Sequence, residues 1–354
     1  MNLLVLNQKL DPADSGLEVA WEWVCELSTR VAKLTVITHE QGPATLPPNV
    51  RVFSLGKERQ FGRARKVREF YSALFKVIRE DRVDACFVHM VPLFAVMASP
   101  VLKVCGIPVV QWYTHASTTF TLRAALAVVD HVATASRESF SLPSPKVVVT
   151  GHGINTDRFR PADRPRESTF HIVTVGRLSP SKRHDRLLLA VARLCEEGTS
   201  VRLSIIGEPR GPDGVAWAER LVAETDRLQL NSVVTFTGAV SRSALPSLYS
   251  TADVCVNLSE TNSIDKAVLE AMSCGVPVIT SNPAFQPLLA DMTTCRVLPD
   301  SQPATVAAGI AAVMRLDESA LRDIRFTLRQ KVVQQHNLST LMDRLIELLG
   351  KRHG

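Results

Sequence analysis

Short runs of β-branched residues alternate with longer stretches of helical periodicity along this sequence, and this alternation constrains its fold more than any other feature. Such a pattern predicts βαβ units built around parallel sheets. Strands are expected at 2–7, 33–38, 50–54, 84–89, 108–113, 130–134 and 146–149, and in a second series at 170–176, 201–206, 233–236 and 254–258. Helical stretches separate most of these strands. The sequence therefore predicts two doubly wound α/β domains, with a ligand cleft between them.

The boundary between the two series is expected in the segment FRPADRPREST, residues 159–169, which is rich in Arg and Pro and lacks an apolar run. A chain of 354 residues is also too long for one ordinary core. We expect domains at residues 1–160 and 161–335, with residues 336–354 forming a helix that packs back on the first domain. Hydrophobic residues at 45% and charged residues at 21% indicate a globular, soluble protein.

The seven cysteines are scattered, and no CxxC pair or Cys/His cluster occurs. This spacing predicts reduced, mostly buried thiols and argues against a metal site or a disulfide framework, which favours the cytoplasm.

The N-terminus lacks the basic and apolar regions of a signal peptide. The most apolar window, residues 91–105, is interrupted by two prolines and a lysine and is shorter than the roughly 20 residues that a transmembrane helix needs.

Residues 253–282 carry the strongest functional signal. An apolar strand, Val254 to Leu258, leads into a polar loop and then a short helix that carries Glu270. In an open parallel sheet, such a loop lies at the carboxyl edge where ligands bind, and the helix N-terminus favours anions. The Glu270 carboxylate is able to accept hydrogen bonds from ligand hydroxyls. The segment therefore predicts a pocket for a ligand that bears both phosphate and hydroxyl groups.

A second signal opens the second series of strands, where Gly176 is followed by Arg177 and Lys182 before a helix. The planar fork of Arg177 suits phosphate oxygens, and Lys182 adds a mobile point charge. The alternative is a pair of solvated cations near a helix start. Because a cation at a helix N-terminus faces the unfavourable end of the dipole unless an anion is bound there, we favour an anion site.

Together these motifs resemble the retaining glycosyltransferases of family 4. The resemblance is carried by GRLSPSKRHD at 176–185, IIGEP at 205–209, VTFTGAV at 234–240 and VLEAMSCGVPVITSN at 268–282, preceded by VTGHGINTDRFRP at 149–161. It is specific in the C-terminal half and weak over the first 80 residues. It implies the GT-B fold, in which two Rossmann-like domains face each other across a cleft.

The resemblance also implies residue roles for binding a nucleotide-sugar donor. Arg177 and Lys182, beside Gly176, match the pair that holds the diphosphate, and Glu270 matches the carboxylate that binds the ribose hydroxyls. The loop 261–266 matches the segment that cups the donor sugar and phosphate. Its donor-binding candidates are Asn262, Ser263, Ile264, Asp265 and Lys266. For Glu270, the alternative is an ordinary exposed carboxylate on a helix.

Asn262 departs from the family pattern, which usually has a glutamate at this position, eight residues before the ribose-binding one. Glu260 is displaced from that position by two residues. Asp265 is expected either to supply the missing carboxylate or to cap the helix that carries Glu270. An amide still donates and accepts hydrogen bonds but brings no charge. The identity of the donor sugar is therefore left open.

In the first half, His115 follows an apolar strand and matches the family histidine that reaches the donor sugar. A packed or solvent-facing histidine is the alternative. Gly16, in the loop after the first strand, fits close approach of its backbone to the donor phosphate, although the usual paired glycine is missing. His89 is a secondary candidate for acceptor contacts, and His152 is expected in the turn toward the linker.

The implied function is transfer of a sugar from a nucleotide-diphosphate sugar to an acceptor hydroxyl, with Arg177, Lys182 and His115 as the catalytic candidates. The nucleotide sugar is a substrate, so no cofactor is expected. No D-x-D motif occurs, and we expect a metal-independent reaction in which cations stabilise the leaving diphosphate. The family implies retention of configuration. A nucleotide-sugar epimerase of the same architecture and a non-catalytic sugar-nucleotide-binding protein are the alternatives.

Eight Lys and Arg residues face three Glu between Lys57 and Glu80, in a stretch with an apolar stripe at helical spacing. Such a helix could rest on an anionic membrane surface, and peripheral membrane contact of a cytoplasmic protein is our hypothesis. The alternative is an ordinary helix with solvated cations. Nucleic-acid binding is not expected, because the basic residues lack interleaved aromatics and any known reader motif.

Overall fold

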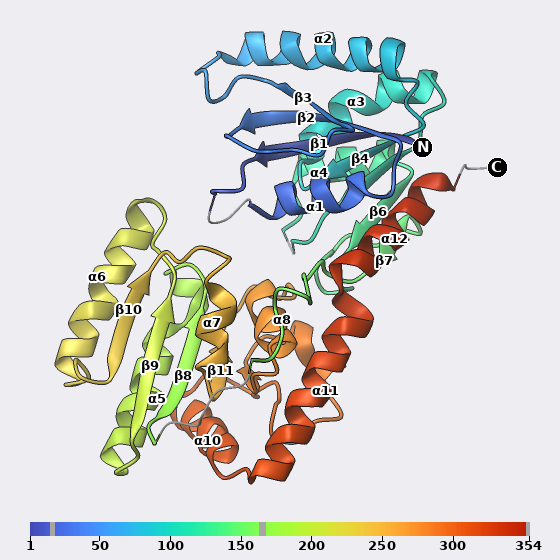
Figure 1. The fold of residues 1–354 in the computed structure, drawn as a ribbon. Helices are drawn as coiled ribbons and strands as arrows, with labels where there is room; N and C mark the ends of the chain where they lie inside the picture. The colour runs from blue at the N-terminus through green and yellow to red at the C-terminus, as the bar shows by residue number, and fades with distance from the viewer. Residues whose placement is uncertain (15–17, 116, 163–167, 352–354) are drawn as a thin grey trace. The chain divides into compact units, whose positions relative to one another are not determined.

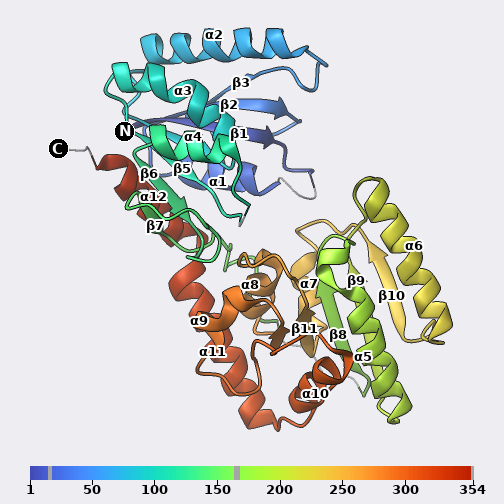
Figure 2. The ribbon, with the colours of Figure 1, turned by 180° about the vertical axis from the view of Figure 1, so that it is seen from behind.

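The computed structural model describes residues 1–14, 18–115, 117–162 and 168–351. The chain divides into two compact units, one formed by Met1–Gly153 with Leu338–Gly354 and the other by Ile154–Asn337. Figures 1 and 2 show the two units from opposite sides, with the chain coloured from blue to red. Each unit contains a parallel sheet with helices on its faces, so the predicted doubly wound α/β class is confirmed.

The sheet of unit 1 has seven parallel strands in the order β3-β2-β1-β4-β5-β6-β7. They are β1 (Asn2–Leu10), β2 (Lys33–Gln41), β3 (Val50–Ser54), β4 (Ala85–His89), β5 (Val109–Trp112), β6 (His131–Thr134) and β7 (Val147–Val149). The helices of this unit are α1 (Glu18–Ser28), α2 (Arg63–Asp81), α3 (Pro92–Val104), α4 (Phe120–Val128) and α12 (Leu338–Gly350). Every strand predicted in this half is present, with small shifts at the ends.

The burial pattern explains how these helices cover the sheet. Leu3 to Leu6 form a continuous buried run in β1, as expected for a strand covered on both faces. On α2, Phe70, Leu74 and Val77 recur at helical spacing and are buried. They share one core with residues of α3 and α4 on one face of the sheet. On the other face, α12 contacts α1, β4 and β5.

The sheet of unit 2 has five parallel strands in the order β10-β9-β8-β11-β12. They are β8 (Phe170–Val175), β9 (Val201–Ile206), β10 (Val234–Gly238), β11 (Val254–Asn257) and β12 (Val278–Thr280). The helices are the short η1 (Pro180–Lys182) and η2 (Pro283–Phe285), with α5 (His184–Glu196), α6 (Gly211–Arg227), α7 (Leu245–Ser250), α8 (Lys266–Ser273), α9 (Gln286–Leu289), α10 (Pro303–Met314) and α11 (Glu318–His336). The order reverses between β8 and β11, which is where doubly wound sheets bind ligands.

The division between the units falls at Gly153 and Ile154, before the segment that the sequence suggested as a linker. The reason is that residues 154–162 are bonded to unit 2. The Ile154 N–H donates to the His336 carbonyl at 2.8 Å, and the Phe159 carbonyl accepts from Arg329 Nη1 at 3.0 Å. Residues 163–167 of the expected linker lie outside the described residues.

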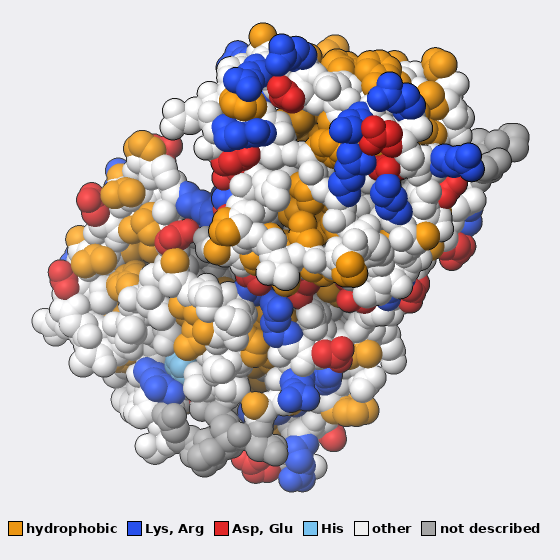
Figure 3. Space-filling view, turned by 45° about the horizontal axis from the view of Figure 1, so that its top comes forward, with side chains coloured by type: hydrophobic (Ala, Val, Ile, Leu, Met, Phe, Trp, Pro, Cys, Tyr) orange, Lys and Arg blue, Asp and Glu red, His pale blue; other side chains and the backbone are white. Residues whose placement is uncertain are grey.

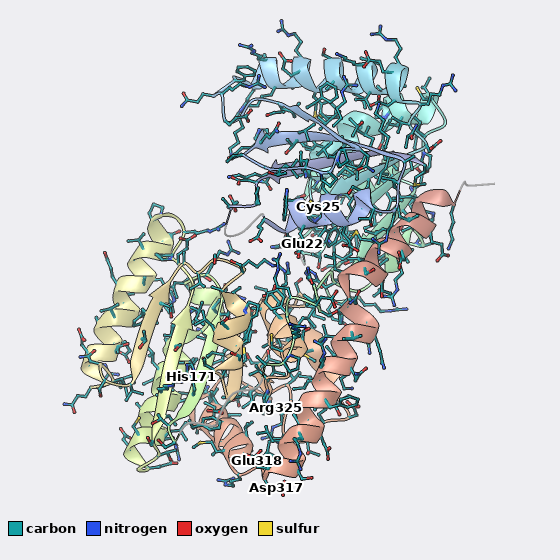
Figure 4. The ribbon with its side chains drawn as sticks, viewed as in Figure 1. Glu22, Cys25, His171, Asp317, Glu318 and Arg325 are labelled. Atoms are coloured by element: carbon teal, nitrogen blue, oxygen red, sulfur yellow. The ribbon has the colours of Figure 1, made fainter. Side chains whose placement is uncertain are left out.

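The cysteines are free thiols, and four of the seven are buried. Burial, followed by the charges of Glu22 and Glu26, raises the pKa of Cys25 to about 11. Figure 4 labels Cys25 and Glu22 on α1. The Cys25 thiol is therefore protonated at neutral pH and is a poor nucleophile.

None of the helices that the structure describes is both long enough and apolar enough to cross a membrane.

Candidate functional site

The candidate site of unit 2 lies where two loops leave the carboxyl ends of the neighbouring strands β8 and β11. One loop runs over 176–183 and the other over 258–265, and together they occupy the point at which the strand order reverses. The two loops contact each other directly: the Glu260 N–H donates to the Ser181 carbonyl at 3.0 Å. The segments that sequence analysis selected separately therefore form one surface within unit 2.

Two glycines allow the backbone to adopt this arrangement. A Cβ added to Gly207, which has a φ of +143°, would lie 1.9 Å from the carbonyl oxygen of Gly176. Gly176 itself has a φ of +152°, and a Cβ there would lie 3.3 Å from Cε of Lys182. A side chain at either position would separate the loops or displace Lys182. Gly176 is therefore required by close approach of the backbone and of Lys182.

Lys182 is held by Asp265, with which it forms an ion pair across the two loops. Asp265 also accepts a hydrogen bond from Asn257 Nδ2 at 3.0 Å and caps α8 by accepting from the Ala267 N–H at 3.3 Å. Burial raises the pKa of Asp265, but the charge of Lys182 and these hydrogen bonds outweigh burial and hold the pKa below its usual value. Of the two roles open to Asp265, the structure shows the helix cap.

Glu270 is buried on α8, with 4% of its surface exposed, and it pairs with a cation that sequence analysis missed. Arg242 Nη2 lies 2.9 Å from Glu270 Oε1, and Lys266 Nζ lies 3.8 Å from the same oxygen. Arg242 comes from the loop between β10 and α7, and its guanidinium stands 5.4 Å from the centroid of the Phe159 ring. The alternative of an exposed helix carboxylate is therefore wrong for Glu270.

The remaining loop candidates have separate environments. Glu260 pairs with Arg183, with 2.7 Å between its Oε1 and the arginine Nε, and both side chains are partly exposed. Asn262 is exposed and has a φ of +51°, a conformation that Asn tolerates better than most residues. Ile264 is buried, and the Ser263 carbonyl accepts from Asn282 Nδ2 at 2.8 Å. Glu260 is thus engaged by Arg183.

Arg177 is exposed at the start of the first loop, with its side chain available to solvent. Directly after this loop in the sequence, His184 begins α5, and its side chain is almost completely buried. Burial, and next the charge of Lys182, lower the pKa of His184 to about 4, so its imidazole is neutral at neutral pH. The positive charge of the site therefore comes from lysine and arginine, without a contribution from this histidine.

The histidines selected in unit 1 differ in their surroundings. His115 is exposed in the loop between β5 and α4, where its Nδ1 accepts from the Ser117 N–H at 3.0 Å. His89 stacks on Trp23, with 4.7 Å between ring centroids. His152 is buried, and its Nδ1 accepts from the following backbone N–H at 2.9 Å. Gly16 lies outside the described residues.

Comparison with known proteins finds a family match over the second half of the chain. The model for "Glycosyl transferases group 1" matches residues 155–326, which include every candidate of the unit 2 site. Residues 155–326 are thus similar to glycosyl transferases group 1. The D-inositol 3-phosphate glycosyltransferase of Mycobacterium sp. (strain KMS) is 34% identical over 146 residues, which are 38% of this chain and 32% of that protein. The match thus spans about a third of the relative's length.

Two further similarities extend over more of the chain. The putative colanic acid biosynthesis glycosyltransferase WcaL of Escherichia coli (strain K12) is 27% identical over 220 residues, covering 60% of this chain and 53% of that protein. The crystal structure of Anabaena Alr3699/HepE in complex with UDP covers 99% of both chains with a TM-score of 0.78 and 16% identity. At this identity, the structural similarity shows the shared GT-B-type fold alone.

Proposed function

We propose that this chain belongs to glycosyl transferases group 1 and is a cytoplasmic glycosyltransferase that moves a sugar from a nucleoside diphosphate sugar to an acceptor hydroxyl. The observation that carries the proposal is the site at the β8/β11 switch point, where Arg177 and Lys182 stand on the loop facing α8 and its buried Glu270. Cations and helix N-termini stabilise a diphosphate, and a carboxylate accepts hydrogen bonds from ribose hydroxyls. UDP in the Anabaena structure supports a nucleotide ligand.

The residues of the site suggest how the donor is held. Lys182 has three donors, and its pair with Asp265 fixes the ammonium while leaving donors for phosphate oxygens. Arg177 adds an exposed guanidinium fork. Arg242 and Lys266 lie 2.9 and 3.8 Å from Oε1 of Glu270, and a carboxylate has about four acceptor sites, so Glu270 is able to accept further hydrogen bonds from ribose hydroxyls. Arg242 fixes the orientation of that carboxylate before any ligand binds.

In the proposed reaction, negative charge grows on the departing diphosphate while the acceptor oxygen attacks the anomeric carbon. Arg177 and Lys182 would stabilise that charge, and no metal is required for this role. We retain His115 as the unit 1 residue proposed to contact the donor sugar. Retention of configuration is part of the proposal through the family resemblance. Asn262 and Lys266 are proposed to set the preference for the donor sugar.

A donor-turnover assay tests this function. The protein is incubated with UDP-, GDP- and ADP-sugars, and released nucleoside diphosphate and isomerised sugar are measured. We expect diphosphate release from one donor class and its loss in Lys182→Ala and Glu270→Ala, with unfolding curves recorded in parallel. Isomerised sugar would instead indicate an epimerase. Binding without turnover would indicate a non-catalytic protein, and wild-type turnover in both variants would refute the site.

We also propose peripheral contact of unit 1 with an anionic membrane surface. The exposed large hydrophobic side chains of this unit lie mostly on α2, α3 and α4, namely Val67, Phe75, Leu93, Val104 and Phe120. Basic residues of α2 lie among them, and Figure 3 shows blue and orange side chains side by side over this region. Salt-sensitive sedimentation with anionic vesicles would support the contact, and its absence would refute it.

A further inference from the structure

Unit 1 has a pocket of its own, and none of its lining residues is a described residue of the proposed donor site. It has a volume of about 760 Å³ and lies at the carboxyl edge of the sheet, against residues that follow β3, β4 and β5. The N-terminal turns of α2, α3 and α4 complete its wall. Pockets for small molecules usually measure about 300–1,000 Å³, so this one has the size of a ligand site.

Most of the pocket wall is apolar. Phe70 and Phe94 are buried side chains whose rings stack at 5.4 Å between centroids, and Met97 and Leu55 line the same space. Leu93 stands in the wall with about half of its surface exposed. An apolar wall of this kind stabilises an aliphatic or aromatic group of a ligand by removing both surfaces from water.

Cationic side chains enter the same pocket from the first two turns of α2. Lys66 Nζ lies 3.3 Å from Nε2 of His39, and Arg63 lies one turn earlier on the same side of the helix. Among the residues that the structure describes, no carboxylate lies within ion-pair distance of Arg63 or Lys66. Arg63 is exposed and Lys66 is half-buried, so the two cations give the pocket a positive charge that an anionic ligand would neutralise.

The surroundings of His39 show the same excess of positive charge. Burial, and next the charges of Lys66 and Lys57, lower the pKa of His39, although Glu40 and Glu58 oppose this shift. A neutral His39 accepts a hydrogen bond from Lys66. The N-termini of α2 and α3 add to the positive electrostatic potential of the pocket, because both helices begin without a side-chain cap and without an acidic residue in the first turn. Such helix N-termini favour an anion.

We propose that this pocket binds an amphiphilic phosphate, with the apolar body against Phe70, Phe94 and Met97 and the phosphate at Arg63 and Lys66. Phosphate suits the arginine fork and the lysine charge, and the apolar part of the wall suits an aliphatic or aromatic body better than a hydrated sugar. The role of this ligand as the sugar acceptor rests on the proposed function. Its binding to the pocket does not, because binding requires no transferase activity.

The direct test is isothermal titration calorimetry with decyl phosphate below its micelle concentration, using decanol and inorganic phosphate as comparison ligands. We expect decyl phosphate to bind more tightly than either, because only it uses both the wall and the cations. Lys66→Ala should weaken binding about tenfold, the loss of one charged hydrogen bond. Arg68→Ala is the matched control: this exposed arginine of α2 lies outside the pocket wall and should leave the affinity unchanged.

Three results would overturn the proposal. The first is that inorganic phosphate binds as tightly as decyl phosphate. The second is that Arg68→Ala loses as much affinity for decyl phosphate as Lys66→Ala, and the third is that decyl phosphate binds only when it is presented in anionic vesicles. Either of the last two results would indicate that the basic surface of the protein, and not the pocket, attracts the ligand. If the pocket variant loses binding as expected but no donor is turned over, the pocket stands and the transferase function fails. If transfer occurs and is unaffected by saturating decyl phosphate, the transferase stands and the acceptor role fails.

Discussion

Replacing Arg242 by Met should destabilise unit 2 strongly, because it leaves the buried carboxylate of Glu270 without its nearest cation. The two side chains are 8% and 6% exposed, and their atoms approach to 2.9 Å. Removing one partner of a buried ion pair costs about 3–5 kcal/mol. Lys266, at 3.8 Å from the same oxygen, offsets part of this cost. We therefore expect a loss near the lower limit, about 3 kcal/mol.

The assay is urea unfolding followed by peptide-level hydrogen exchange, which reports Lys266–Ser273 of unit 2 separately from unit 1. Arg193→Met is the matched control, because Arg193 pairs with Glu197 at 3.0 Å with both side chains more than half exposed. Such a helix pair is worth only about 0.3–0.5 kcal/mol. Adding Glu270→Gln to Arg242→Met should recover much of the stability. Equal losses in Arg242→Met and Arg193→Met would refute the reasoning.

Three further predictions concern other parts of unit 2. Gly207→Ala should cost about 3 kcal/mol through collision with the Gly176 carbonyl, whereas Gly198→Ala, with nothing within 4 Å of its added Cβ, should lose less in the same urea titration. Burial lowers the pKa of His184 from its ordinary value of 6.5 to about 4 in the folded state, so the folded state binds fewer protons and stability falls as the pH drops from 6.5 to 4. His184→Leu should remove about 3 kcal/mol of that pH dependence, and an unchanged slope would contradict it. Asp317, labelled in Figure 4 at the start of α11, accepts a backbone N–H at 2.8 Å, and Asp317→Ala should cost about 1 kcal/mol in thermal unfolding.

The fold could be predicted from the sequence because the strands are continuous β-branched runs between helical repeats. The run at 201–206 has the bounds of β9 as predicted, and α2 (Arg63–Asp81) covers most of the stretch 57–80 in which an apolar stripe at helical spacing was expected. The division between units was harder to place. Residues 154–162 belong to unit 2 because the Phe159 carbonyl bonds to Arg329, which lies far away in the sequence. Only the folded structure reveals such a contact.

The site was predictable where its residues lie on recognisable strand-to-helix loops. Glu270 and Lys182 stand at one edge of the sheet because β8 and β11 are neighbours. Arg242 could not be found, since a lone arginine in a loop after β10 gains meaning only when the fold brings it to Glu270. The role of Asp265 was open for the same reason, because capping is local but its ion pair with Lys182 spans 83 residues.

The most direct test of the proposed donor site is calorimetric binding of UDP, GDP and ADP to the wild-type protein, Lys182→Ala and Arg193→Ala. Our account predicts that at least one diphosphate binds to the wild type and that Lys182→Ala weakens it about tenfold or more, while Arg193→Ala binds normally. Asp265→Asn, which keeps a capping side chain, should report whether the Lys182 ion pair positions that cation. Absence of binding to all three nucleotides, or unchanged affinity in Lys182→Ala, would contradict the account.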